Sequence, residues 1–234
     1  ATRPVSRRPP DPAFWLPAFY RRLYQAFGPQ HWWPGRTRLE VIVGAILTQN
    51  TSWKNVSRAI RQLRRHKKLS HHALSGMTAA ELAPLIRSSG YYNQKAIKVT
   101  AFLRWLRDEY GGSLDRLFRT PLPELREELL ARKGIGPETA DSILLYAGGL
   151  PVFVVDAYTR RIFSRHGLVS EKIPYEELRT LCERHLAGGG PGLPDTVPLY
   201  NEYHALLVRL GNQYCRKTPR CEACPVARAF PPCR

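Results

Sequence analysis

Apolar residues recur three and four positions apart along most of this chain, and short polar, glycine-rich or proline-rich segments separate them. This spacing places apolar side chains on one face of an α-helix, whereas no segment shows the clear alternation typical of a half-buried strand. We therefore predict an all-α protein. The expected helices are residues 13–27, 38–47, 53–65, 79–88, 94–110, 121–131, 138–147, 157–166, 175–186 and 199–215.

A glycine-containing turn interrupts the helical pattern between residues 130 and 138. Gly134 and Gly136 flank a single apolar residue, Ile135, and Pro137 suits the first position of the next helix. The unpaired amides at the start of that helix could hold a phosphate, so the segment predicts a helix-hairpin-helix that grips a nucleic-acid backbone. An ordinary helix pair with a glycine turn is the alternative. The candidate DNA contacts here are Lys133, Gly134, Ile135, Gly136 and Thr139.

One carboxylate, Asp156, follows the apolar run 152–155 and precedes a predicted helix. Such a carboxylate could stabilise a developing cation or activate water. Its position after an apolar run suggests partial desolvation, which would raise its pKa. The alternative is a purely structural role as a helix N-cap, a position that Asp favours.

The charge balance indicates a polyanionic partner. The 234 residues carry a formal net charge of +17, with a pI of about 10.1. No apolar run is long enough for a membrane span, and residues 1–12 form a basic tail without the apolar core of a secretory signal. We expect a cytoplasmic, monomeric protein without a membrane partner, and surface positions for His166 and His185.

Four cysteines lie close together at the C-terminal end of the chain. In a protein inside the cell, clustered cysteines indicate a metal site rather than disulfides, and zinc is the first expectation for four thiolates. A fifth, Cys182, lies within a helical pattern and is expected in the core. The candidate ligands are Cys215, Cys221, Cys224 and Cys233.

The hairpin, the apolar run and Asp156 together resemble the signature of the endonuclease III superfamily of DNA glycosylases. This resemblance implies a two-lobed helical fold with a cleft between the lobes: residues 38–150 in one, and 13–37 plus 151–234 in the other. It implies that Asp156 drives cleavage of the bond between base and deoxyribose in double-stranded DNA. It also implies a C-terminal loop holding a [4Fe-4S] cluster on the four cysteines, although the family spacing C-x6-C-x2-C-x5-C here becomes C-x5-C-x2-C-x8-C.

The chain departs from lyase-competent relatives at one position. Their hairpin reads Gly-x-Gly-x-Lys-Thr-Ala, and the lysine forms a Schiff base with the sugar; here Glu138 stands in its place. Lys133 could substitute, although a phosphate contact is the favoured role. Glu138 is a second catalytic candidate beside Asp156, because its charge could help to stabilise the cation or contact a cationic methylated purine. It also matches the branch of endonuclease III-like 3-methyladenine DNA glycosylases. The other motifs of that branch stand here as Trp32-Trp33-Pro34, Leu47-Thr48-Gln49-Asn50-Thr51, Gly90-Tyr91-Tyr92-Asn93-Gln94-Lys95-Ala96 and the run from Gly134 to Asp141.

In that branch an aromatic pocket sandwiches the alkylated purine, and the matching positions are Trp32, Trp33 and Trp53, of which Trp53 could equally be a core residue. Gln49 matches the residue that fills the gap left by the flipped base, and Tyr91 matches the wedge. For both residues the alternative is a structural role in a turn, as a polar residue after a helix and as an exposed aromatic.

These observations favour a glycosylase that removes alkylated purines without efficient lyase activity. An endonuclease III-type glycosylase and lyase acting on oxidised pyrimidines, or a catalytically weak DNA-binding protein on the same scaffold, remain the alternatives.

Overall fold

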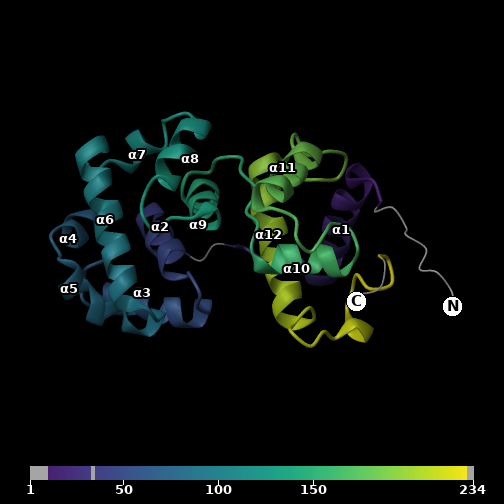
Figure 1. The fold of residues 1–234 in the computed structure, drawn as a ribbon, viewed down its shortest axis with the longest axis horizontal. Helices are drawn as coiled ribbons and strands as arrows, with labels where there is room; N and C mark the ends of the chain where they lie inside the picture. Colours follow the sequence, from purple (N-terminus) through teal and green to yellow (C-terminus); the bar gives the residue numbers. More distant parts are fainter. Residues whose placement is uncertain (1–9, 33–34, 231–234) are drawn as a thin grey trace. The chain divides into compact units, whose positions relative to one another are not determined.

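The computed structural model describes residues 10–32 and 35–230, and these fold into helices joined by loops (Figure 1). Within these ranges there is no strand, only one isolated bridge between Gly190 and Leu193. The all-α prediction is therefore confirmed. None of the described helices is both long and apolar enough to cross a membrane.

The described residues divide into two compact units, one formed by 10–32 with 151–230 and the other by 35–150. The first, unit 1, contains α1 (Pro12–Phe27), α10 (Ala157–Arg165), α11 (Tyr175–Leu186), α12 (Thr196–Gln213) and the short 3-10 helix η3 (Cys221–Ala223). The second, unit 2, contains α2 (Arg38–Leu47), α3 (Trp53–Arg65), α4 (His71–Ser75), α5 (Ala79–Leu82), the 3-10 helix η1 (Ala83–Ser89), α6 (Tyr92–Tyr110), α7 (Leu114–Leu117), α8 (Leu122–Leu130), α9 (Pro137–Ser142) and the π-helix η2 (Ile143–Ala147).

Helix α2 is the centre of unit 2. Its residues 39–47 are all buried, and it packs against α3, α6, α9 and η2. A helix that is apolar on every side must be enclosed by others, so its sequence alone accounts for this position. The buried carboxylate of Glu40 is paired with Arg64 of α3.

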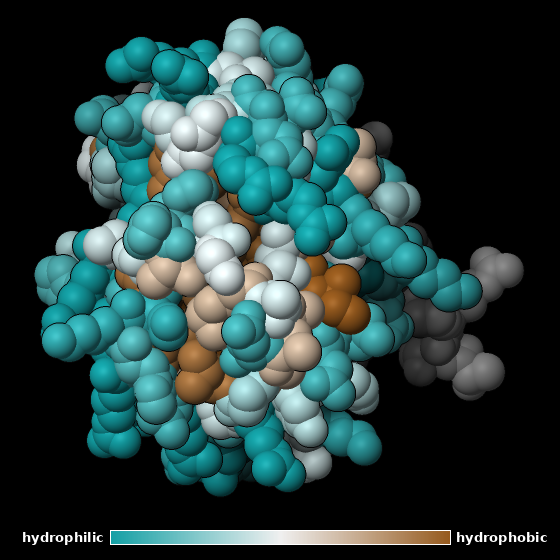
Figure 2. Space-filling model, turned by 90° about the vertical axis from the view of Figure 1, so that its left-hand side faces the viewer, coloured by the Kyte–Doolittle hydropathy of each residue, from teal (hydrophilic) through white to brown (hydrophobic). Residues whose placement is uncertain are grey.

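Helix α3 shows how unit 2 separates its core from its charge. The helix buries Val56, Ala59, Ile60 and Leu63. Its opposite face exposes a stripe of cations, namely Lys54, Arg58, Arg61 and Arg65. Four cations therefore share one face of this helix, opposite its buried face. On the side of the molecule where α4, α5 and α6 lie in Figure 1, the surface is mostly hydrophilic, with hydrophobic patches near its middle (Figure 2).

Unit 1 is built around aromatic side chains. Phe163 of α10 lies edge-on to Trp15, with ring centroids 4.8 Å apart, and Phe153 lies 5.8 Å from Tyr203 of α12. Cys182 is fully buried, as predicted. His166 was expected at the surface, but this is wrong: it is 1% exposed and packs edge-on to Phe19, since it follows the last turn of α10 toward the core.

Two of the expected helices change geometry along their length, and the short helices α4 and α7 were not expected. The expected helix at 79–88 is α5 followed by the 3-10 helix η1, because Pro84 has no amide hydrogen with which to continue the α-helical pattern. The expected helix at 138–147 changes to π geometry from Ile143 onward.

Candidate active site and nucleic-acid interface

The predicted hairpin is present in unit 2, between α8 and α9. Gly134 has φ +89°, a backbone conformation that favours glycine, and a Cβ atom there would lie 2.6 Å from Cε of the flexible Lys98 side chain, which would have to move. Ile135 is 5% exposed and fills the space under the turn. Gly136 has an ordinary φ of −92° and open space around its Cα, so its lack of a side chain leaves the start of α9 accessible.

The N-terminal end of α9 has no side-chain cap. The start of a helix is the positive end of its dipole and a place where backbone amides lack intrahelical partners, so this end of α9 suits an anion. Lys133 and Glu138 are exposed on either side of the turn. Thr139, a candidate DNA contact, is only 8% exposed, and its Oγ1 accepts a hydrogen bond from Gln49.

Gln49 is bonded to the hairpin. Its Nε2 donates to the Gly134 carbonyl at 2.9 Å and to Thr139 Oγ1 at 3.0 Å, while its Oε1 accepts from Lys98 Nζ at 2.5 Å. Both amide hydrogens are thus used within unit 2. Filling a gap in DNA would require Gln49 to exchange these bonds for bonds to a base.

A buried lysine joins the segment of Gln49 to that of Tyr91. Lys95 is 2% exposed, and its Nζ donates to the carbonyls of Leu47, at 2.9 Å, and Ser89, at 2.6 Å. Burial, together with the nearby charge of Lys98, lowers the pKa of Lys95 to about 8. Both carbonyls end helices, where the backbone is electronegative. The ammonium therefore fixes the two segments relative to each other.

Tyr91 stands at the N-terminus of α6 in the left-handed region, with φ +46°, and is 75% exposed. An aromatic residue at positive φ is uncommon and costs energy, and here it holds a large apolar side chain in solvent. This exposure is the property that a wedge residue needs.

Asp156 belongs to unit 1, at the N-terminus of α10. Its Oδ1 accepts from the Thr159 amide at 2.7 Å and from Thr159 Oγ1 at 2.9 Å, which makes it the N-cap. Its Oδ2 lies 3.4 Å from Nε2 of His204 on α12, within ion-pair range although longer than a typical hydrogen bond. The Asp156 side chain is 10% exposed and that of His204 7%.

The expectation that desolvation would raise the pKa of Asp156 is wrong in its net direction. Burial does oppose ionisation, but the contact with His204 and the two bonds from Thr159 outweigh it, so the pKa lies below its usual value. Asp156 is consequently a carboxylate at neutral pH. His204 could not be predicted as a partner of Asp156, because residues 48 positions apart in the sequence share no pattern.

Asp156 is positioned by an extended segment, 151–156, that has no strand beside it. The Phe153 amide donates to Glu183 Oε1 at 2.9 Å, and the Val155 amide donates to the Tyr175 hydroxyl at 3.4 Å. Both partners lie on α11. Side chains therefore replace the sheet that would otherwise satisfy these buried amides.

The candidate pocket tryptophans do not form one cluster within either unit. Trp32 is half-buried in unit 1, Trp53 is half-buried at the start of α3 in unit 2, and Trp33 lies outside the described residues. The loop before Trp32 is fixed to α12: the Gln30 amide donates to Glu202 Oε1 at 2.6 Å, and Arg209 donates to Gln30 Oε1 at 3.1 Å.

Three of the four candidate cysteine ligands lie in the described part of the chain, and Cys233 lies outside it. Cys215 is buried; Cys221 and Cys224 are half-buried, and none of the three is in a disulfide. Burial raises the pKa of Cys224, amide hydrogen bonds from Val226 and Ala227 oppose this, and the other two thiols lie close enough to raise it further. Among residues 10–32 and 35–230, no group of three possible ligands is arranged to hold a metal.

The cysteine-bearing segment is attached to α10. Arg161 donates to the Cys215 carbonyl at 2.9 Å, and Arg165 donates to the carbonyls of Arg216 and Lys217 at 2.5 and 3.2 Å. Arg165 also lies 3.5 Å from Cys215 Sγ. The helix that begins at Asp156 therefore ends against this segment.

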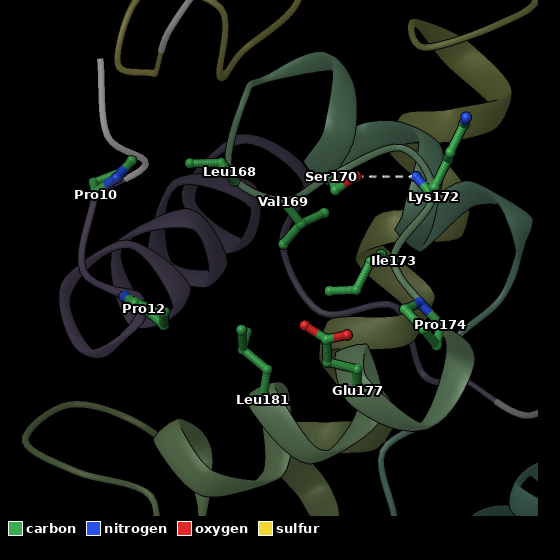
Figure 3. Close-up of a pocket in the computed structure, with 10 residues that line it drawn as sticks. All are labelled: Pro10, Pro12, Leu168, Val169, Ser170, Lys172, Ile173, Pro174, Glu177 and Leu181. Carbon is green, nitrogen blue, oxygen red and sulfur yellow. Dashed lines mark hydrogen bonds between the residues drawn. The ribbon is translucent and has the colours of Figure 1, made fainter. Parts of the chain in front are cut away.

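A cavity of about 470 Å³ lies elsewhere in unit 1, between the start of α1, residues 168–174 and α11 (Figure 3). Its lining includes Pro12, Leu168, Ile173 and Glu177. None of the candidate catalytic, pocket or cysteine residues lines it.

Comparison with known proteins identifies the class to which this fold belongs. Residues 43–187 match the model of the HhH-GPD superfamily base excision DNA repair proteins, so the chain belongs to this superfamily and is a base-excision DNA glycosylase. The hairpin and Asp156 both lie within the matched range.

Individual relatives agree with this assignment. The candidate DNA repair glycosylase MJ1434 of Methanocaldococcus jannaschii is 44% identical over 209 residues, which span 88% of this chain and 91% of that protein. The structure of the H. pylori 3-methyladenine DNA glycosylase bound to 1,N6-ethenoadenine is similar with a TM-score of 0.73 and 28% identity, covering 87% of this chain and 98% of that one. A non-covalent endonuclease III–DNA complex has the same fold, with a TM-score of 0.76, 22% identity and 95% coverage of both chains.

Proposed function

We propose that this glycosylase hydrolyses alkylated purines from double-stranded DNA and leaves the strand intact. The observation that carries the proposal is Glu138, exposed at the first turn of α9 in the position where lyase-competent relatives have lysine. A carboxylate has no nitrogen with which to form a Schiff base. The motif of Trp32 and Trp33, and the similarity to the H. pylori 3-methyladenine glycosylase, favour the purine substrate.

The proposed reaction uses the carboxylate of Asp156. As the bond from C1′ to the base nitrogen breaks, its electron pair leaves with the base, and C1′ becomes cationic. Asp156, ionised at neutral pH, stabilises that cation until water attacks C1′ and gives up a proton. An alkylated purine that is already cationic leaves as a neutral base, so no general acid is required.

DNA binding in this proposal uses the hairpin and the net charge of +17. The amides of α9 and Lys133 contact phosphates, which positions the enzyme without reading sequence. Tyr91, exposed at 75%, enters the stack where the base is extruded. Trp32, Trp33 and Trp53, which match the aromatic pocket of the 3-methyladenine branch, are the candidates on which an electron-poor purine stacks.

The identity of the released base tests the proposed substrate class. Incubation with DNA treated with a methylating agent should yield free methylated purines, identified by mass spectrometry, and an Asp156→Asn control should yield none above background. Duplexes with oxidised pyrimidines should release little. Release of oxidised pyrimidines alone would instead support the second candidate, an endonuclease III-type enzyme that uses the exposed Lys133. Tight binding without release of either would support a DNA-binding protein.

We also propose that the C-terminal cysteines hold a [4Fe-4S] cluster. The four-cysteine pattern of the sequence and the backbone amides that donate to Cys224 suit the anionic sulfurs of such a cluster, with Cys215, Cys221, Cys224 and Cys233 as the ligands. The cluster would fasten the segment after α12 next to α10. It takes no part in the proposed hydrolysis.

The purified protein should therefore be brown and contain about four irons per chain, measured by absorbance and metal analysis. Cys221→Ser should lose the iron, whereas Cys182→Ala, which changes the buried cysteine of α11, should keep it. A colourless protein with stoichiometric zinc would show that the zinc alternative is right.

A further inference from the structure

His204, the buried histidine that faces Asp156, has no role in the proposed hydrolysis. His204 is 6% exposed, on the face of α12 that packs against α10, and its Nε2 lies 3.4 Å from Asp156 Oδ2. We propose that His204 is a positioning residue for the glycosylase reaction: the contact of its Nε2 with Oδ2 fixes the oxygen of Asp156 that the N-cap leaves free. This inference rests on the catalytic role proposed for Asp156.

The two oxygens of Asp156 are held in different ways. Oδ1 accepts two short hydrogen bonds from Thr159 and is committed to capping α10. Oδ2 has no part in the cap, so it is the oxygen that can respond to charge on a sugar. A nitrogen that faces Oδ2 from α12 sets its direction, while a second lone pair remains for the developing cation.

The contact also keeps the carboxylate ionised. Burial of Asp156 opposes ionisation, and the hydrogen bond and charge interaction with His204 come first among the influences that counter it, ahead of the bonds from Thr159. Removing His204 leaves Asp156 buried but takes away much of the interaction that offsets the effect of burial on its pKa. The pKa of Asp156 should then rise, so that a larger fraction is protonated, and inactive, at any given acidic pH.

Other charged groups in unit 1 do not duplicate this contact. On α10 the bonded neighbour of Asp156 is Thr159, which does not titrate, and Arg160 lies one turn along. On α12 the neighbouring titratable residues are Tyr200 and Tyr203, whose pKa values burial raises, and Glu202, which accepts from the Gln30 amide. In the described chain, only His204 and Thr159 counter the effect of burial on Asp156.

Two substitutions of His204 distinguish its role as a donor to Asp156 from its role in packing. His204→Leu removes the donor and keeps an apolar side chain, whereas His204→Gln replaces Nε2 with an amide nitrogen that can donate. His166→Leu is the matched control, because His166 is equally buried but packs against Phe19 instead of Asp156. Base release under single-turnover conditions, on the substrate of the wild type and at saturating enzyme, is measured from neutral pH down to the lowest pH at which the wild type stays folded.

For His204→Leu we expect the rate of base release to fall at least about tenfold, the factor that corresponds to one pKa unit. We also expect the acid limb of the pH–rate profile to shift to higher pH. His204→Gln should recover most of the rate, and DNA affinity should stay within about twofold in both, since phosphate contacts dominate it. An unchanged rate and acid limb in His204→Leu would overturn the proposal. So would equal losses in His204→Leu and His204→Gln with no shift of the acid limb.

A second measurement does not depend on activity. The carboxyl carbon of Asp156 is followed by NMR in protein labelled at aspartate, and Asp156→Asn identifies its resonance. In His204→Leu its titration midpoint should rise, and in His166→Leu it should stay in place. If the midpoint moves but no protein releases base, the contact is real and the proposed function is wrong; an unmoved midpoint refutes the contact itself.

Discussion

Asp156→Asn is expected to lower the rate of base release by about 10²- to 10³-fold while leaving DNA affinity nearly unchanged, the range found when one preorganised charge-stabilising group is removed from an active site. The substitution removes the charge proposed to stabilise the cation at C1′. It leaves the hairpin of unit 2 and the surface cations that bind phosphates intact. Single-turnover release and binding to undamaged duplex, measured side by side, check both parts.

The fold should tolerate this change. Asparagine is as good an N-cap as aspartate, so its side-chain oxygen can still accept from the Thr159 amide. Asp156→Ala is the informative comparison, because it removes the cap as well and should cost about 1 kcal/mol of stability. Equal melting temperatures for wild type and Asp156→Asn, with near wild-type release, would leave Asp156 with a capping role only.

The wild-type enzyme is expected to release bases without cutting the strand. Strand cleavage by covalent chemistry requires an amine that condenses with C1′, and the family position for that amine is Glu138. Borohydride should therefore trap little covalent enzyme–DNA adduct, and nicks should appear only after alkali. Efficient trapping that disappears in Lys133→Ala would place the protein among the lyases.

Glu138→Lys is expected to gain measurable trapping, since it places an amine on the first turn of α9. A negative charge suits a helix N-terminus, so the reversal should cost about 0.5 to 1 kcal/mol of stability. Glu138→Gln is the control: it removes the charge, supplies no nucleophilic amine and should trap nothing. Trapping by Glu138→Gln to the same extent would assign the adduct to another lysine.

Features that depend on neighbours in sequence were predictable. The apolar faces of the helices, the requirement for Gly134 and the N-cap position of Asp156 follow from periodicity and local backbone geometry. Lys95 was within reach as well: it falls on the apolar face of α6 with Val99, Phe102 and Leu106, and a lysine at such a position must find acceptors inside the fold.

Features that depend on distant packing were not predictable. Nothing near Gln49 in the sequence indicates that its side chain is bonded between Lys98 and the hairpin. The same holds for His204, which reaches Asp156 only because α12 packs on α10. The net pKa of Asp156 was misjudged for this reason: burial could be inferred from the apolar run, whereas the groups that offset it could not.

The extended segment before Asp156 makes one acid on α11 a determinant of where the proposed catalytic carboxylate lies. Glu183 accepts a hydrogen bond from the Phe153 amide through Oε1, and its Oε2 lies 2.6 Å from Arg179 Nη1. The position of the extended segment therefore depends on this ion pair. Selection for repair should therefore act on Glu183 and Arg179 as a pair, although neither touches DNA in the proposed function. A lineage that loses one of them would need a new acceptor for the Phe153 amide before Asp156 could keep its place.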